Sequence, residues 1–193
     1  MSESINSTLQ EDVAVYVDPK HRSLAALGIF LSMFSNIFCY GSISIIMPAL
    51  VAKVGGMELY SLVFTLTTLA TVIFGPLAGR LGSIYDKGRV IILGTIFNII
   101  GNVATAFAPT MPIVLALRLI ASGGGAFATV LGLTIIGLIF PSAQRMKWIG
   151  YYGTLMAGSN VVAPILAGFL SDSIGWEWVF YLTVPISIVA ILM

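Results

Sequence analysis

Arg118 is the residue whose type and position most strongly suggest chemistry, because it is a charge within a long apolar segment, 112–140. If this segment crosses a membrane, burying an arginine in it costs a few kcal/mol. Arg118 is then expected to face protein or water and to have a functional role there. The alternative is that its long side chain reaches back to the membrane surface and has no such role. We favour the inward-facing position.

The sequence offers few other groups for catalysis or metal binding. It contains one cysteine, Cys39, and one histidine, His21, so neither a disulfide nor a cysteine or histidine metal cluster is expected. Motifs typical of metalloproteases, serine hydrolases and nucleotide-binding proteins are absent. The net charge of +1 gives no electrostatic case for nucleic-acid binding. We therefore predict a protein that is not an enzyme and that uses no metal or cofactor.

Neutral polar side chains also occur inside apolar segments, namely Asn36, Asn98, Asn102 and Asn160. Lipid offers such groups no hydrogen-bond partner, so each must find one in protein or water. Hydrogen bonds between helices are the simpler explanation. The alternative is that Asn36, with the nearby Phe38 and Cys39, lines a cavity for an apolar or amphipathic solute.

The elements that position these residues are predicted from composition and from the length of the apolar blocks. Apolar residues make up 58% of the chain and charged residues 9%, whereas a soluble domain carries about 25% charged residues. Blocks of roughly 20 apolar residues match the length of a membrane-spanning helix. The predicted spans are 24–50, 60–82, 90–108, 112–140, 147–170 and 178–193. The last span is short, and we expect it to be a truncated helix.

The loops and the N-terminal segment predict an orientation in the plasma membrane. The segment 1–22 is polar, unlike a signal peptide, and is predicted to be a cytoplasmic tail. With the N-terminus inside, Lys53 is the basic residue of the external loops. The cytoplasmic segments then hold Lys20, Arg22, Arg80, Lys87, Arg89, Arg145 and Lys147. This bias predicts a multi-pass protein with a cytoplasmic N-terminus.

The stretch 75–90 carries a glycine-rich, basic turn between the second and third spans. It resembles the loop signature of the major facilitator superfamily, with Ser83 where that family has aspartate. The resemblance implies a gating loop, to which we assign Gly79, Arg80, Asp86, Lys87 and Arg89. A basic loop that only sets the topology is the alternative.

Two further segments resemble motifs of this superfamily, and the second of these motifs is typical of its 14-helix drug:proton antiporter branch. Arg118, followed by glycines 123–125, is similar to the fourth-helix motif, which implies a role in handling protons or substrate. Gly158, Pro164 and Gly168 resemble the antiporter motif of the fifth helix, where small residues allow close helix packing. Ordinary packing without a functional role is the alternative for both segments.

A departure from the branch lies in the first span, where Cys39 stands in place of a membrane-embedded aspartate. This half of the protein therefore lacks an obvious carboxylate for proton coupling.

The resemblance covers 24–193 and implies an all-α bundle of six transmembrane helices, built as a 3+3 inverted repeat, that forms half of the superfamily fold. It further implies proton-coupled export of small organic molecules by alternating access. The bundle is expected to lie in the lipid bilayer and to work with a missing C-terminal half or a second copy of itself. The alternative is a half-transporter that does not transport, or a membrane subunit that needs a partner.

Overall fold

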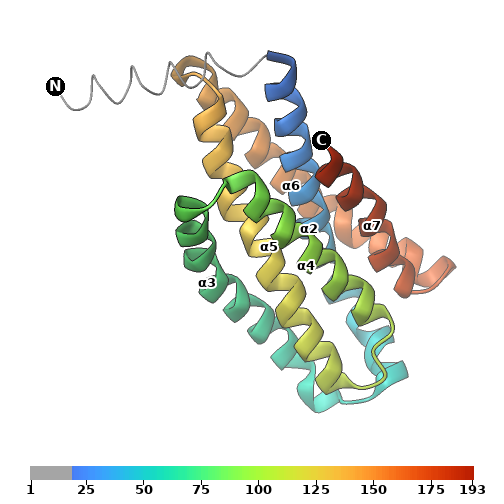
Figure 1. The fold of residues 1–193 in the computed structure, drawn as a ribbon. Helices are drawn as coiled ribbons and strands as arrows, with labels where there is room; N and C mark the ends of the chain where they lie inside the picture. The colour runs from blue at the N-terminus through green and yellow to red at the C-terminus, as the bar shows by residue number, and fades with distance from the viewer. Residues whose placement is uncertain (1–18) are drawn as a thin grey trace.

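The computed structural model describes residues 19–193, so the greater part of the predicted tail, 1–18, lies outside the described residues. Six long helices and a short 3₁₀ turn, Met57–Leu59, make up this part of the chain (Figure 1). The long helices are α2 (Pro19–Val54), α3 (Tyr60–Ile84), α4 (Lys87–Ala106), α5 (Met111–Ile139), α6 (Ser142–Ser173) and α7 (Glu177–Leu192). The predicted all-α fold is thus confirmed.

Local signals in the sequence set several of the helix ends. Asp86 caps α4, because its Oδ1 accepts a hydrogen bond of 2.7 Å from the backbone N–H of Gly88. A proline in the first turn of α5, Pro112, suits a position whose N–H has no partner within the helix. Gly55 and Gly56 have φ angles of 76° and 81°, which glycine adopts without strain, and they turn the chain after α2.

Each predicted span overlaps one helix, but α2 and α6 start five residues earlier than predicted, the largest differences at any helix start. The structure begins α2 at Pro19 instead of 24, and α6 at Ser142 instead of 147. The hydropathy pattern marks only the part of a helix that suits hydrocarbon, whereas backbone hydrogen bonding continues into the polar flanks. Residues 19–22 therefore belong to α2 and not to a separate tail.

The helices have the length and the surface of membrane-spanning segments. Five of them, α2 to α6, are long and apolar enough to cross a bilayer, and α7 is an apolar helix of 16 residues. Large apolar side chains point outward, among them Val72, Ile165 and Phe169, with 65, 66 and 68% of their surface exposed. Such a surface suits lipid, because a soluble monomer rarely exposes large apolar patches.

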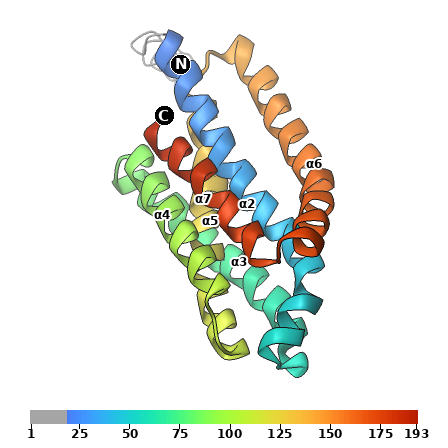
Figure 2. The ribbon, with the colours of Figure 1, turned by 90° about the vertical axis from the view of Figure 1, so that its right-hand side faces the viewer.

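The helix contacts repeat when α2, α3 and α4 are exchanged with α5, α6 and α7. α2 packs against α6 and α7, and in the same way α5 packs against α3 and α4. The pairs α2–α5 and α4–α7 are also in contact, and the exchange leaves each of these pairs unchanged. Figure 2 shows α7 running between α2 and α4. Three crossings bring the chain to the opposite end of the bundle, so the second set of helices is inverted. The contacts therefore fit the predicted 3+3 inverted repeat.

Three consecutive glycines let α5 meet three other helices at the centre of the bundle. A Cβ atom on Gly123 would lie 3.0 Å from the ring of Phe74 on α3. A Cβ on Gly124 would lie 2.4 Å from the carbonyl oxygen of Gly94 on α4, and one on Gly125 would overlap the side chain of Asn36 on α2. Close approach of the backbones is thus possible only because these residues lack side chains.

The fifth of the six helices, α6, packs differently from the prediction. The contact with α2 runs through Ala163 and Ala167, both fully buried, and a Cβ on Gly41 would lie 3.2 Å from that of Ala163. Gly158 borders open space, and a Cβ on Gly168 would make only an ordinary contact of 3.8 Å. Within this bundle these two glycines make no close helix contact, so their predicted packing role stays a prediction. Pro164 lies inside the helix without ending it.

An ion pair joins α2 to α7 at the end of the bundle opposite Asp86, between Lys53 Nζ and Glu177 Oε1. We expect Glu177→Gln to lower the free energy of unfolding by at most about 1 kcal/mol, because both side chains are partly exposed and their attraction is screened. Thermal unfolding of Glu177→Gln, of Lys53→Gln and of the double variant measures the coupling free energy between the two side chains. A coupling well above that value would show that the ion pair is shielded from water.

Candidate functional site

The side chain of Arg118 lies in the centre of the bundle, with 4% of its surface exposed. Its Nη1 donates a hydrogen bond of 3.0 Å to Asn102 Oδ1 on α4 and lies 3.6 Å from Cys39 Sγ on α2. The ring of Phe180 on α7 covers the guanidinium, with its centroid 5.1 Å from Cζ, a cation–π contact. Four helices thus meet at Arg118, and its side chain lies inside the bundle.

A chain of amides continues the hydrogen bonding away from Arg118. Asn102 Oδ1 also accepts a hydrogen bond from the Cys39 thiol at 3.0 Å, and Asn102 Nδ2 donates to Asn98 Oδ1 at 3.0 Å. Asn98 Nδ2 in turn donates to the carbonyl oxygen of Ala121 on α5 at 2.8 Å. The positions i and i+4 of one helix bring the two asparagines together. We call Arg118, Cys39, Asn98 and Asn102 the central cluster.

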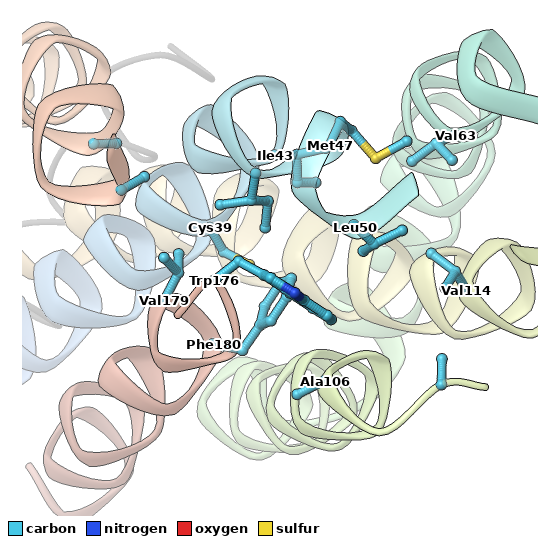
Figure 3. Packing of buried hydrophobic residues seen from close by; sticks show 14 of the residues in the cluster. Cys39, Ile43, Met47, Leu50, Val63, Ala106, Val114, Trp176, Val179 and Phe180 are labelled. Atoms are coloured by element: carbon cyan, nitrogen blue, oxygen red, sulfur yellow. The ribbon is translucent and has the colours of Figure 1, made fainter. Parts of the chain in front are cut away.

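The apolar core packs around the central cluster at the α2–α7 contact. Figure 3 shows Cys39 of α2 and Phe180 of α7 in one buried apolar cluster, which also includes Ala106 of α4 and Trp176, the residue before α7. Phe38 belongs to this core, with 1% of its surface exposed, and its ring stacks on that of Phe34. The core therefore holds the cluster in place and separates it from lipid.

A small cavity of about 30 Å³ lies beside the central cluster. This is the volume of about one water molecule, and polar groups are there to bind one. Its lining includes Asn36 and Cys39, together with Tyr40, Thr67, Thr71, Asn102, Arg118, Ser122 and Thr129. Phe38 is not in this lining and belongs to the apolar core.

The structure adds site residues that the sequence pattern alone did not single out, notably Tyr40, Ser122 and Phe180. Tyr40 is 47% exposed, and its hydroxyl lies 3.4 Å from that of Thr68 on α3, which places a polar pair at the outer edge of the cavity. A signal for Ser122 existed in its position four residues after Arg118, on the same helix face. Phe180 is distant in sequence, so no local pattern could indicate it.

The predicted gating residues lie apart from the central cluster, at the turn between α3 and α4. Gly79 and Arg80 are exposed on the last turns of α3, and Asp86 is the cap of α4. Asp86 and Lys87 also border a cavity of about 410 Å³ between α2, α4, α5 and α7. Arg89 borders an apolar groove of about 370 Å³ between α3 and α4. A gating role for this turn stays a prediction.

No group of three or more histidine, cysteine or carboxylate side chains gathers within residues 19–193 in a way that suits a metal ion. Cys39 is a free, buried thiol. Its neighbours are an arginine and an amide, which do not form a metal site with it.

Removing Asn102 tests the hydrogen bonding of the buried charge. We expect Asn102→Ala to lower the free energy of unfolding by about 1–3 kcal/mol, because Arg118 then loses its oxygen acceptor while it stays buried. The double variant Asn102→Ala, Arg118→Met should recover most of this loss, since no unpaired charge remains. Thermal unfolding in detergent measures both. Equal stability of Asn102→Ala and the unchanged protein would contradict the importance of this hydrogen bond.

Residues 29–193 match the Major Facilitator Superfamily. The chain belongs to this superfamily. It is 32% identical over 160 residues to "Multidrug resistance protein 3" of Bacillus subtilis, a match that covers 83% of this chain and 30% of that protein. It is 27% identical over 170 residues to "Multidrug efflux pump SdrM" of Staphylococcus aureus, covering 88% of this chain and 38% of the other. The chain thus spans about a third of the length of these relatives.

Solved structures of this superfamily share the fold of the bundle. A crystal structure of a D-xylose–proton symporter superposes with a TM-score of 0.71 and 15% identity, covering 89% of this chain and 46% of the symporter. A bacterial homologue of the human lysosomal transporter Spinster, in an inward-facing conformation, gives a TM-score of 0.70 and 20% identity, covering 91% and 43%. At this identity the likeness establishes the fold, and the bundle corresponds to somewhat less than half of each structure.

Proposed function

We propose that this chain forms one six-helix half of a secondary transporter that exports small organic molecules by alternating access. The observation that carries the proposal is a buried arginine held by three other helices, next to a small polar cavity, in a chain of the major facilitator superfamily. A buried charge in a membrane protein marks a functional site, because the membrane makes such a residue costly. The names of the relatives support efflux of drug-like molecules.

The second half of the transporter would pack against the polar side of the bundle. Tyr40 and Thr68 form a hydrogen-bonded, exposed pair between α2 and α3, and Asn160 is exposed on α6. Exposed hydroxyl and amide groups are unfavourable against lipid tails, so these positions suit an aqueous path or another bundle. A further six-helix bundle, from the same polypeptide or from a second chain, is the partner that we propose.

The proposed orientation places the α3–α4 turn in the cytoplasm and Lys53 outside, in the plasma membrane. In alternating access the two bundles rock about the substrate near the centre of the membrane. The turn with Arg80, Asp86, Lys87 and Arg89 would then contact the second bundle when the cytoplasmic side is closed. Proton coupling would depend on a carboxylate of the second bundle, because residues 19–193 place their carboxylates at helix ends.

Reconstitution of the native-length protein tests this proposal. The product found in membranes is identified by its intact mass, purified, and incorporated into liposomes. Uptake of anionic and cationic fluorescent amphipaths is then measured under a pH gradient of either direction. Transport above that of empty liposomes, and its loss in the Arg118→Met variant, is the expected result.

No transport of any probe, under either gradient, would overturn the proposal. The chain would then be a membrane subunit without transport activity of its own. Co-purification of an unrelated membrane protein, instead of a second six-helix bundle, would also indicate a membrane subunit.

A further inference from the structure

All of the described side chains that contact Arg118 are neutral. These are the Asn102 amide oxygen, the Cys39 thiol and the face of the Phe180 ring. Each of them stabilises a cation by a dipole, a polarisable atom or a ring quadrupole, but none carries a full negative charge. A buried charge without a counter-charge is strongly unfavourable, so this site is an attractive position for an anion.

The carboxylates of the described residues are not placed to supply that anion. They are Glu58, Asp86, Asp172 and Glu177. Glu58 lies in the turn between α2 and α3, and Asp172 lies in the last turn of α6. Asp86 caps α4, and Glu177 pairs with Lys53. The central cluster therefore keeps its positive charge within this bundle.

The cavity beside Arg118 offers further groups that suit an anion. Asn36, Tyr40 and Ser122 line it together with Arg118 and carry amide or hydroxyl donors. The volume of about 30 Å³ is that of about one water molecule, so a carboxylate would enter by displacing this water and moving the lining side chains apart. A whole drug-sized molecule does not fit. Tyr40 lies in this lining and is 47% exposed, so the remainder of a bound molecule can extend past it, out of the bundle.

We propose that the transported molecules are amphipathic organic anions whose carboxylate or sulfonate binds in this cavity against the Arg118 guanidinium. An arginine binds carboxylates and similar groups through charge-assisted hydrogen bonds, which are about twice as strong as neutral ones. The apolar body of the molecule then extends past the ring of Tyr40, between this bundle and the second one. This inference rests on the proposed transport function.

Probes that share one body and differ in charge test the inference. The native-length protein in liposomes is given pyrenebutyrate or a pyrenebutyl trimethylammonium, and initial rates of uptake are compared. The expected result is that the anion is transported at least about ten times faster than the cation, because only the anion gains from the buried charge.

Two variants of matched shape separate the charge from the fold. Cys39 lies 3.6 and 3.8 Å from the two terminal nitrogens of Arg118, so Cys39→Asp adds a carboxylate next to the guanidinium. Cys39→Asn adds a group of the same size without charge. We expect the ratio of anion to cation transport to fall about tenfold or more in Cys39→Asp relative to Cys39→Asn, because the new carboxylate occupies the position of the anion. Binding of both probes by fluorescence, in detergent, gives a second readout that does not depend on transport.

The outcomes distinguish this inference from the function on which it rests. Transport of the cation but not the anion, or equal ratios in the Asp and Asn variants, would overturn the anion site while export as such stands. In that case a carboxylate of the second bundle supplies the counter-charge of Arg118. Absence of transport for both probes would overturn the proposed function and the inference together.

Discussion

Replacing Arg118 by methionine is expected to reduce transport to the level of empty liposomes while the protein stays folded. Methionine keeps most of the length of the side chain and packs well against Phe180 and the Cys39 sulfur. The change removes a buried charge that lacks a counter-charge, so the free energy of unfolding should be unchanged or higher. Initial rates of uptake and thermal unfolding of the same preparation measure both effects.

The variant Arg118→Lys is the matched control, because it keeps the charge but loses the planar hydrogen bonding to Asn102. We expect it to retain part of the transport rate, at least about tenfold above Arg118→Met, since charge is the main requirement. Transport by the methionine variant at the rate of the unchanged protein would show that Arg118 has a structural role only.

The substitution Gly124→Ala is expected to have the largest effect on folding. The new Cβ would lie 2.4 Å from the Gly94 carbonyl oxygen and 2.6 Å from the backbone nitrogen of Asn98. Both atoms belong to the backbone of α4, so the whole helix must move away from α5. Overpacking of this kind costs about 1–3 kcal/mol, and here it also displaces Asn98 from the central cluster. Thermal unfolding and the yield of monodisperse protein measure the effect.

A control on the same helix is Gly137→Ala, since a Cβ at that position meets no atom within 4 Å. There the same substitution is expected to be neutral or to stabilise α5 by up to about 1 kcal/mol, because alanine favours the helix more than glycine does. If both variants unfold alike, the close contact between α4 and α5 is not important for stability.

Much of the fold could be predicted because a membrane imposes a simple pattern on the sequence. Helices that cross hydrocarbon need long apolar blocks, and these blocks gave six ranges that each overlap one helix of the structure. The helix ends were less accurate, as the early starts of α2 and α6 show. Hydropathy does not report helical structure that continues outside the membrane.

The central cluster could be predicted only in part. The position of Arg118 in an apolar segment indicated a buried, inward-facing residue, and the asparagines in apolar segments indicated hydrogen bonds between helices. That Cys39 and Phe180 would meet Arg118 depends on how helices far apart in sequence pack, which local patterns do not contain. For the same reason Phe38 was assigned to the cavity but lies in the core.

The packing of α6 shows why small residues are ambiguous in sequence. Alanine and glycine both permit close contact, and only the rotation of the helix about its axis decides which of them faces a neighbour. In α6 that rotation puts Ala163 and Ala167 against α2 and leaves Gly158 at an open surface. An outward-facing glycine such as Gly158 is therefore available for contact with the proposed second bundle.

The most direct test of the account is the rate at which N-ethylmaleimide modifies Cys39 in the native-length protein, with and without a transported probe. Cys39 lines the small cavity and touches Arg118, so a probe bound there must shield its thiol. Mass spectrometry of the peptide that contains Cys39 gives the rate at this position alone. We predict slow modification, since 2% of the residue is exposed, and a further decrease of about tenfold at saturating probe. An unchanged rate at saturating probe would contradict binding at the central cluster.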